Sequence, residues 1–423
     1  MVRRREFGRA FTLLVAAAGL AACVADTGGV GYGRPVVIGG AAGSQAGPGS
    51  AAPGRRVAIL LPLTGPNAEV GQAMLRAAQL SLDQPAAPSL DARDTGGTPA
   101  GAAEAARLAL AGGAGLILGP LTAGETGAVA PLAKAAGVPV LAFTSDTAQA
   151  QPGVWTLGIT PAQQVRRLVL AVQAEGKTRV AAVLPRNAFG DALASGLTST
   201  AAAVGLTEPR VVRYSAGFAG INAALKDVSG YSTRRGAIEE QQKAARASGD
   251  ADGRREATEL GRQTMSPPPV DALLLGAAGD QLGQALPLLA FYDIGPEQVR
   301  ILGPALWARE ISHLSAISGA WYAAPDPAQR APFEQQYTAK YNAPPRELAS
   351  LAFDAASVAR VAAESGGFAP GALTRPEGFA GADGLLALQP DGQVRRGLAI
   401  FEIDHGGSHI VQPAPGSLSA PGA

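Results

Sequence analysis

The feature that most constrains the fold of this chain is a regular alternation of short apolar runs with longer amphipathic stretches. The run RVAILLPL at residues 56–63 has the length and composition of a buried strand, and residues 69–82 place apolar side chains along one helical stripe. The same pair recurs along the chain as far as residue 292. Continuous Val, Ile and Leu runs, each followed by a helix, predict parallel strands that are covered by helices on both faces. Because the series begins again after Pro161, we expect an α/β fold with two doubly wound, Rossmann-like lobes.

The strand ends predict where a ligand would bind. In open parallel sheets, ligands sit outside the carboxyl ends of the strands. In this sequence, the loops concerned follow Leu63, Gly119, Phe143, Pro185 and Gly276. We therefore expect a cleft that is built from these loops.

The N-terminal residues have the pattern of a secretory signal peptide. Arg3–Arg5 form a basic start, and the apolar run Phe11–Leu20 is too short to span a membrane. Two alanines separate this run from Cys23, which is the single cysteine of the 423 residues, so an intramolecular disulfide is excluded. The sequence LAAC at its end resembles the bacterial lipobox, whose cysteine becomes the acylated N-terminus. The alternative is an apolar cysteine without function inside a cleaved signal.

Composition argues against several partners. The net charge of +1 speaks against nucleic-acid binding, which needs a clustered basic face. Residues 25–55 are rich in Gly, Ala, Pro and Ser and predict a flexible tether. Outside the signal peptide no apolar run reaches spanning length either, so we expect membrane attachment through a lipid anchor only. Val24 after the cysteine, in place of aspartate, indicates the outer membrane within the lipoprotein class.

Three stretches carry a resemblance to a known family. They are VAILLPLTGPNAEVGQAMLRAAQLSL, GLILGPLTAGETGAVAPLAKAAGVPVLAFTSD and VAAVLPRNAFGDAL. Together they resemble the leucine-binding branch of the type I periplasmic binding proteins. That resemblance implies two lobes joined by three hinge strands, placed near Leu157–Thr160, Ile301–Pro304 and Gly381–Leu385. The expected boundaries are 1–22 for the signal peptide, 23–55 for a disordered tether, 56–158 with 303–382 for lobe 1, 159–302 with 383–412 for lobe 2, 230–269 for a charged helical insertion in lobe 2, and 413–423 for a disordered tail.

The resemblance also implies positions for a ligand, and most of them have lost the required groups. In amino-acid-binding members, hydroxyls and backbone amides hold the carboxylate, while an aromatic and a glutamate hold the ammonium. The corresponding positions are Ala123, Asp146, Ala278 and Ala305, which cannot replace those groups. An ammonium buried without its counter-charge costs several kcal/mol. The candidate cleft residues are Thr64, Gly65, Thr122, Ala123, Thr144, Ser145, Asp146, Ala278 and Ala305.

A second branch of the same fold is more similar. The stretches ILGPALWARE, GAWYAAPDPAQRAPFEQQYTAKYNAPPRELASLAFDA and GFAGADGLLALQPDGQVRRGLAIFEI resemble the penicillin-binding protein activators, which are outer-membrane lipoproteins that stimulate a peptidoglycan synthase. The resemblance covers only the binding-protein-like half of such activators. It implies a lipid-anchored protein on the periplasmic face of the outer membrane, with a peptidoglycan synthase as partner.

The charged stretch at 230–269 departs from the binding-protein pattern. Its charges recur at helical spacing, and Gly249 and Gly253 predict a break into two helices. One interpretation is a solvated hairpin without a particular role. The other is a partner-docking arm, because so long an insertion is uncommon in a compact domain without a use.

Nothing in the sequence indicates catalysis. There is no G-x-S-x-G elbow and no S-x-x-K, so a penicillin-binding enzyme is excluded. Glu402, Asp404, His405 and His409 are metal-like residue types, but they surround a Gly-Gly turn, which is typical of a solvated loop. We expect neither metal nor cofactor.

Two functions of different class remain. The first is a non-catalytic lipoprotein that activates a peptidoglycan synthase. The second is the substrate-binding protein of an ABC transporter for amino acids or another small polar solute, with the ligand in the interlobe cleft. They differ in what the cleft binds.

The lipobox leads to a direct prediction for Cys23. Cys23→Ser should remove the thiol to which the lipid is attached, so that metabolic labelling with a fatty acid marks the native protein and not the variant. A variant that still carries the label would contradict the prediction.

Overall fold

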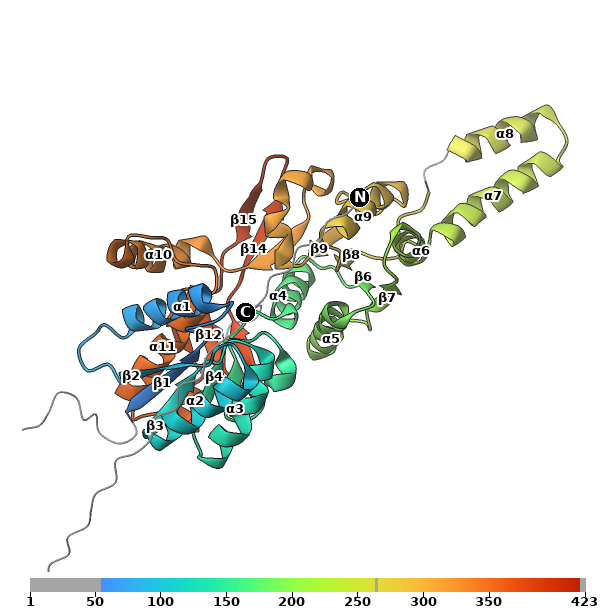
Figure 1. Cartoon of the computed structure of the whole chain (residues 1–423). Coiled ribbons are helices and arrows are strands. Elements are labelled where there is room, and N and C mark those ends of the chain that lie inside the picture. Colours follow the sequence, from blue (N-terminus) through green and yellow to red (C-terminus); the bar gives the residue numbers. More distant parts are fainter. Residues whose placement is uncertain (1–54, 263–264, 419–423) are drawn as a thin grey trace, which may run out of the picture. The chain divides into compact units, whose positions relative to one another are not determined.

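The computed structural model describes residues 55–262 and 265–418. The predicted signal peptide, Cys23 and almost all of the predicted tether lie outside the described residues. The described part contains a parallel five-stranded sheet, a mixed seven-stranded sheet in which β14 runs antiparallel to both of its neighbours, and a small antiparallel sheet (Figure 1). The predicted α/β fold with Rossmann-like lobes is confirmed.

Lobe 1 is built on a five-stranded parallel sheet of order β2-β1-β3-β4-β5. Side chains on β1 alternate between two cores: Val57, Ile59 and Leu61 face α1 and the later helix α11, while Ala58 and Leu60 face α2 and α3. Burial on both faces explains why this strand is continuously apolar. The elements are β1 (Arg56–Leu61), α1 (Ala68–Ser81), β2 (Ser89–Asp94), α2 (Pro99–Ala111), β3 (Ala114–Leu118), α3 (Ala123–Ala135), β4 (Val140–Ala142), η1 (Thr147–Gln149) and β5 (Val154–Thr156).

Lobe 2 contains a seven-stranded sheet of order β15-β14-β10-β9-β8-β6-β7. On β6, Ala181 and Val183 face the core with α6 and α9, and Ala182 and Leu184 face α4 and α5. The elements up to the sheet centre are α4 (Pro161–Ala174), β6 (Val180–Pro185), α5 (Ala188–Ala203), β7 (Arg210–Tyr214), α6 (Phe218–Val228), α7 (Tyr231–Ala247), α8 (Ala251–Arg262), β8 (Ala272–Leu275), α9 (Asp280–Phe291) and β9 (Arg300–Gly303). The later elements are η2 (Ala305–Arg309), η3 (Ile311–His313), η4 (Ser315–Ile317), β10 (Trp321–Ala324), β14 (Ala399–Ile403) and β15 (Ser408–Gln412).

The chain returns to lobe 1 between β10 and β14. Phe333, Tyr337, Leu386 and Val394 belong to the same core as β1. Their elements are α10 (Pro327–Tyr341), α11 (Ala349–Glu364), α12 (Pro370–Leu373), β11 (Phe379–Gly381), β12 (Gly384–Leu388) and β13 (Val394–Arg396), the last three forming the antiparallel sheet.

Two of the expected hinge positions are wrong. Ile301–Pro304 includes β9, which lies inside the seven-stranded sheet between β8 and β10, so the chain leaves lobe 2 only after β10, at 325–326. Gly381–Leu385 lies in the β11–β12 hairpin of lobe 1, so 383–397 belongs to lobe 1 and the third crossing is at 397–398. The first crossing follows β5, at 157–160, where it was expected.

The predicted disordered tail also needs correction at its start. Ala414 and Leu418 are buried, and the Pro413 carbonyl accepts a hydrogen bond from Arg167. Residues 413–418 are therefore packed against the protein, and 419–423 lie outside the described residues.

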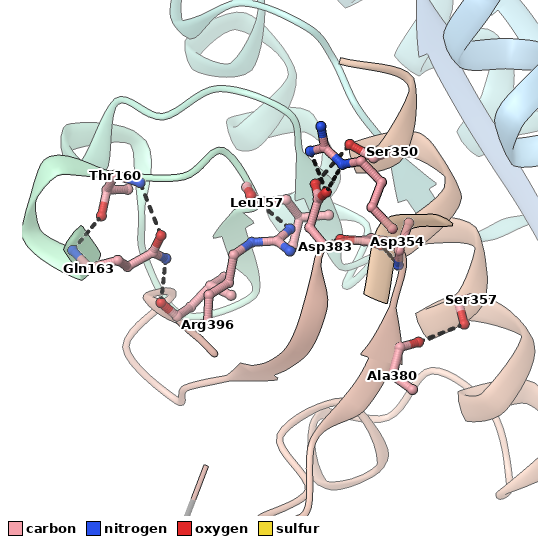
Figure 2. A network of polar contacts seen from close by, with 12 residues as sticks. Leu157, Thr160, Gln163, Ser350, Asp354, Ser357, Ala380, Asp383 and Arg396 are labelled. Atoms are coloured by element: carbon pink, nitrogen blue, oxygen red, sulfur yellow. Dashed lines mark hydrogen bonds and ion pairs between the residues drawn. The ribbon is translucent and has the colours of Figure 1, made fainter. Parts of the chain in front are cut away.

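A buried ion pair links the first and third crossings (Figure 2). The Arg396 Nη1 atom lies 2.7 Å from Asp354 Oδ2, and both side chains are fully buried. The second guanidinium nitrogen of Arg396 donates to the Leu157 carbonyl at 3.1 Å, and the Ala382 amide donates to Asp354 Oδ1 at 2.6 Å. Gly381 allows this approach, since a Cβ there would lie 2.3 Å from Asp354 Oδ1.

Helix α4 fastens the same region from lobe 2. The Gln163 amide group donates to the Val394 carbonyl at 2.6 Å, and Arg167 Nε donates to the Leu398 carbonyl at 2.8 Å. Thr160 and Gln163 form a capping box that begins the helix directly after the first crossing. Side chains from one helix therefore hold both crossings in register.

The environment of Asp354 makes its charge costly. Burial, opposed by the charge of Arg396 and reinforced by Asp383, raises the pKa of Asp354 to about 6. The pKa of an aspartate in an unfolded chain is about 4, so the folded protein binds this proton more tightly. The contribution of Asp354 to stability is thus greatest below about pH 4 and falls as the pH rises through about 6.

We expect Arg396→Met to lower the free energy of unfolding by about 3–5 kcal/mol near neutral pH, because Asp354 would keep a buried charge without its partner. The loss should shrink at pH 5, where the carboxyl can take up a proton. Urea denaturation at both pH values measures it. Arg107→Met, which removes only an exposed pair with Glu104, is the control and should change stability little. An equal loss at both pH values would contradict this account of Asp354.

Candidate functional site

A cavity of about 810 Å³ is lined by residues of both lobes. Thr144 and Ser145 reach it from the loop after β4, and Ala305 reaches it from η2 after β9. These are carboxyl ends of parallel strands, as the general rule for open sheets requires. The cavity is also lined by the side chains of Gln164, Arg309, Tyr322, Arg330, Glu334, Glu347, Ser350, Asp383 and Phe401.

Most charged groups of this cavity pair with one another. Arg309 Nη2 of lobe 2 lies 2.7 Å from Glu347 Oε1 of lobe 1. Arg330 Nε donates to Asp383 Oδ1 at 2.7 Å, and the Ser350 hydroxyl donates to Asp383 Oδ2 at the same distance. Figure 2 shows Asp383 between Ser350 and the guanidinium group.

Glu334 is the exception among the charged lining residues. It has no hydrogen-bond or ion-pair partner among the residues that the structure describes. An ammonium group entering the cavity would therefore meet one free carboxylate, whereas a carboxylate would find no free cation there. The cavity lacks one half of what a zwitterion needs.

The opposite wall is aromatic. Tyr322 on β10 and Phe401 on β14 stack with ring centroids 5.0 Å apart and planes at 6°. The Tyr322 hydroxyl is 2.7 Å from the Ser408 hydroxyl, and burial raises the pKa of Tyr322. This wall can contact apolar ligand surface, but its polar atom is already bonded.

The predicted cleft residues divide into two groups. Thr144, Ser145 and Ala305 line the cavity. Two of these three have committed polar atoms: Thr144 Oγ1 accepts from the Asp146 amide at 3.0 Å, and the Ala305 amide donates to Gln164 at 2.8 Å. The candidates that are not among the lining residues are Thr64, Gly65, Thr122, Ala123, Asp146 and Ala278.

The hydroxyls outside the cavity have structural roles. Thr64 Oγ1 donates to Asp94 Oδ2 at 2.6 Å, in a turn where the Leu63 and Gly96 amides also donate to Asp94. Burial raises the pKa of Asp94, but these hydrogen bonds outweigh it and the net shift is downward. Thr122 begins α3 through a capping box with Glu125.

Trp307 was not singled out from the sequence, yet it positions one side of the cavity. Its indole nitrogen donates to the Ala277 carbonyl at 2.8 Å, and the ring is completely buried in η2. This holds Ala305 and Arg309 in place on either side of it. The motif ILGPALWARE contained the signal, since a tryptophan between Leu306 and Ala308, shortly after an apolar strand, favours burial.

The charged insertion forms two helices, α7 and α8, that pack side by side (Figure 1). The break lies at Ser248–Asp250, so Gly249 was correctly assigned, whereas Gly253 lies inside α8. Few side chains of the pair are buried. Besides Ile238, Ala245 and Ala257, Arg234 is buried; it donates to the carbonyls of Ser229, Ser266 and Tyr292 and so anchors the start of α7.

The described residues hold neither a metal-binding cluster nor a membrane-spanning helix. No group of three or more His, Cys, Asp or Glu side chains gathers there as a metal site would require; Asp404 and His409 simply pair on the β14–β15 hairpin. Over the same residues, no helix has the length and apolarity to cross a membrane.

Comparisons with known proteins agree with this geometry. The family of periplasmic binding proteins matches residues 55–230. Among curated proteins, none matches the chain. A structure assigned to a branched-chain amino acid ABC transporter from Rhodospirillum rubrum has a TM-score of 0.64 at 18% identity, covering 84% of this chain and 99% of that one.

Two structures of LpoA from Haemophilus influenzae are also similar. The LpoA C-domain, described as a regulator of PBP1A, has a TM-score of 0.60 at 15% identity, covering 84% of this chain and 99% of that domain. Full-length LpoA gives a TM-score of 0.62 at 15% identity, with 85% of this chain covered. The chain spans 59% of that longer protein. At these identities the likeness shows the fold, and the predicted resemblance is confirmed at that level.

The close packing of Gly303 against Trp307 predicts that Gly303→Ala destabilises lobe 2. A Cβ there would lie 2.3 Å from the buried Trp307 ring, and such overpacking costs about 1–3 kcal/mol of unfolding free energy. Gly236→Ala is the matched control: it has open space in the middle of α7 and should stabilise by about 0.5–1 kcal/mol. Denaturant titration measures the change in unfolding free energy for both variants. A neutral effect at Gly303 would mean that Trp307 does not fix η2 as described.

Proposed function

From the type I periplasmic binding protein fold of this chain, we propose that it is a non-catalytic periplasmic lipoprotein that activates a peptidoglycan synthase of the penicillin-binding protein class. The anchor would be Cys23 in the outer membrane, and the tether of residues 23–55 would let the folded part reach its partner. No step of this function requires a reaction at the chain itself.

The observation that carries the proposal is the commitment of the cavity's charges. Arg309 and Glu347 pair across the lobes, and Arg330 is held by Asp383. A zwitterionic solute would have to break one of these pairs and leave its partner without a counter-charge. The cost of an unpaired group of this kind is several kcal/mol if it remains buried, as Asp383 would. Tight capture of an amino acid is therefore disfavoured.

Two further features support an interaction role. The fold of the LpoA C-domain, a regulator of PBP1A, is similar over its whole length. The α7–α8 pair adds a surface of exposed charges that the lobes do not need for their cores. Such a surface can choose a partner through complementary charge.

The second candidate is a solute-binding protein of an ABC transporter. Its support is the equally similar transporter structure and a cavity within the size range of small-molecule sites. In that case Glu334 would pair with an amino group of the ligand, and the Tyr322–Phe401 wall would contact its apolar surface. No free cation among the described lining residues would bind a carboxylate.

The test measures both functions on the same protein. Purified chain is mixed with a bifunctional penicillin-binding protein, and the rate of glycan polymerisation and cross-linking is followed. We expect a higher rate with the chain than without it, and calorimetry with amino acids should show no micromolar binding. No stimulation together with micromolar binding of an amino acid would establish the transporter function instead.

A variant separates the contribution of the arm. Replacing 239–259 by a short Gly/Ser linker leaves Arg234 and its contacts intact and removes little buried apolar surface, so melting should be unchanged. Stimulation should fall, and for the native protein it should weaken with salt because exposed charges are screened. If stimulation is unaffected while the protein remains folded, the arm has no docking role.

A further inference from the structure

A second cavity of about 420 Å³ lies beside the hinge and shares no lining residue with the first. Its walls come from α4 and α5 of lobe 2 and from residues 389–396 of lobe 1. Both lobes therefore contribute to this cavity, which lies on the side of α4 that carries Arg166. Nothing in the proposed function uses this groove.

Four arginines line the groove, and two of them are already bound. Arg167 donates to the Leu398 carbonyl, and Arg396 pairs with Asp354. Arg166 and Arg395 differ, because neither has a hydrogen bond or an ion pair with any residue between 55 and 418 that the structure describes. Two free guanidinium groups thus share one groove.

Their positions are electrostatically unfavourable without an anion. Arg166 is half-buried, and burial together with the charge of Arg395 lowers the pKa of its guanidinium. The two groups are therefore close enough to repel each other. Asp391 is the single acidic lining residue, and its Oδ1 accepts a hydrogen bond from the Gln393 amide of its own turn.

Guanidinium groups suit one class of ligand in particular. Their planar forks match the oxygens of phosphate in pairs, and two of them carry the charge that balances a dianion. A carboxylate would neutralise only one. Thr200 on α5 adds a hydroxyl group that can donate to a further oxygen, whereas the Ser199 hydroxyl already donates to the Gly196 carbonyl at 3.2 Å.

We propose that this groove binds a small phosphate-bearing anion between Arg166 of lobe 2 and Arg395 of lobe 1. Such an anion removes the repulsion between the two arginines and bridges the lobes beside the first and third crossings. Occupancy therefore stabilises the lobe arrangement seen in the structure. The inference does not depend on the proposed synthase partner.

The test uses the full chain and inorganic pyrophosphate, with acetate as a control monoanion. Calorimetry should show pyrophosphate binding at millimolar concentration or below, and weaker binding of acetate, which can neutralise only one of the two arginines. Arg166→Gln or Arg395→Gln should weaken pyrophosphate binding by about tenfold or more, since each removes a charge-assisted hydrogen-bonding group. Arg107→Gln, which removes an equal charge from the surface of lobe 1, should leave binding unchanged.

Melting provides a readout that a merely structural role would not give. Without anion, the double variant should melt no lower than the native protein, because it loses only a repulsion. With pyrophosphate, the melting temperature of the native protein should rise and that of the double variant should not. The proposal is overturned if pyrophosphate does not bind the native protein, if the double variant binds it equally well, or if acetate binds as tightly.

Discussion

The two-lobed structure depends on the buried contact between Arg396 and Asp354. It joins the β13 strand and α11 of lobe 1, and through the Leu157 carbonyl it also holds the first crossing between the lobes. Because both charges are removed from water, neither can lose the other without a large penalty. Gln163 and Arg167 of α4 then attach lobe 2 to the same strand region. The interlobe cavity and the groove that contains Arg166 and Arg395 are lined by different residues, and both lie around this contact. The geometry of both therefore depends on it.

The same fastening explains why the cavity is unsuited to a zwitterion. Asp383, two residues from Gly381, is held by Arg330 and Ser350 and contributes to the raised pKa of Asp354. Its carboxylate thus belongs to a network that extends to the hinge. A ligand that recruited Arg330 would disturb this network as well as the cavity. The chain has the periplasmic binding protein fold, but Arg330, Ser350 and Asp383 bond to one another and not to a ligand. This agrees with the principle that function depends on the site and not on the fold.

Sequence reasoning succeeded where one rule decided the outcome. A strand buried on both faces had to be continuously apolar, so the strand expected at residues 56–63 is observed as β1, Arg56–Leu61. The strand-end rule likewise pointed to the loop with Thr144 and Ser145, which line the cavity, whereas Ala305 came from the family resemblance. Sequence reasoning failed for ion pairs whose partners are far apart along the chain and meet only after folding. Arg309 and Glu347 are 38 residues apart, and Arg330 and Asp383 are 53 apart. The second crossing was misplaced because β10 pairs with both β9 and the distant β14, which no local pattern reveals.

The central claim is that the chain acts on a partner through its surface and not through a solute in the interlobe cavity. The most direct measurement is synthase stimulation by Ser145→Trp, which places an indole in the cavity. Ser365→Trp at the exposed end of α11 serves as the matched control. The account predicts that both variants stimulate as well as the native protein. Stimulation that is lost in Ser145→Trp and kept in the control, with both variants folded, would contradict it.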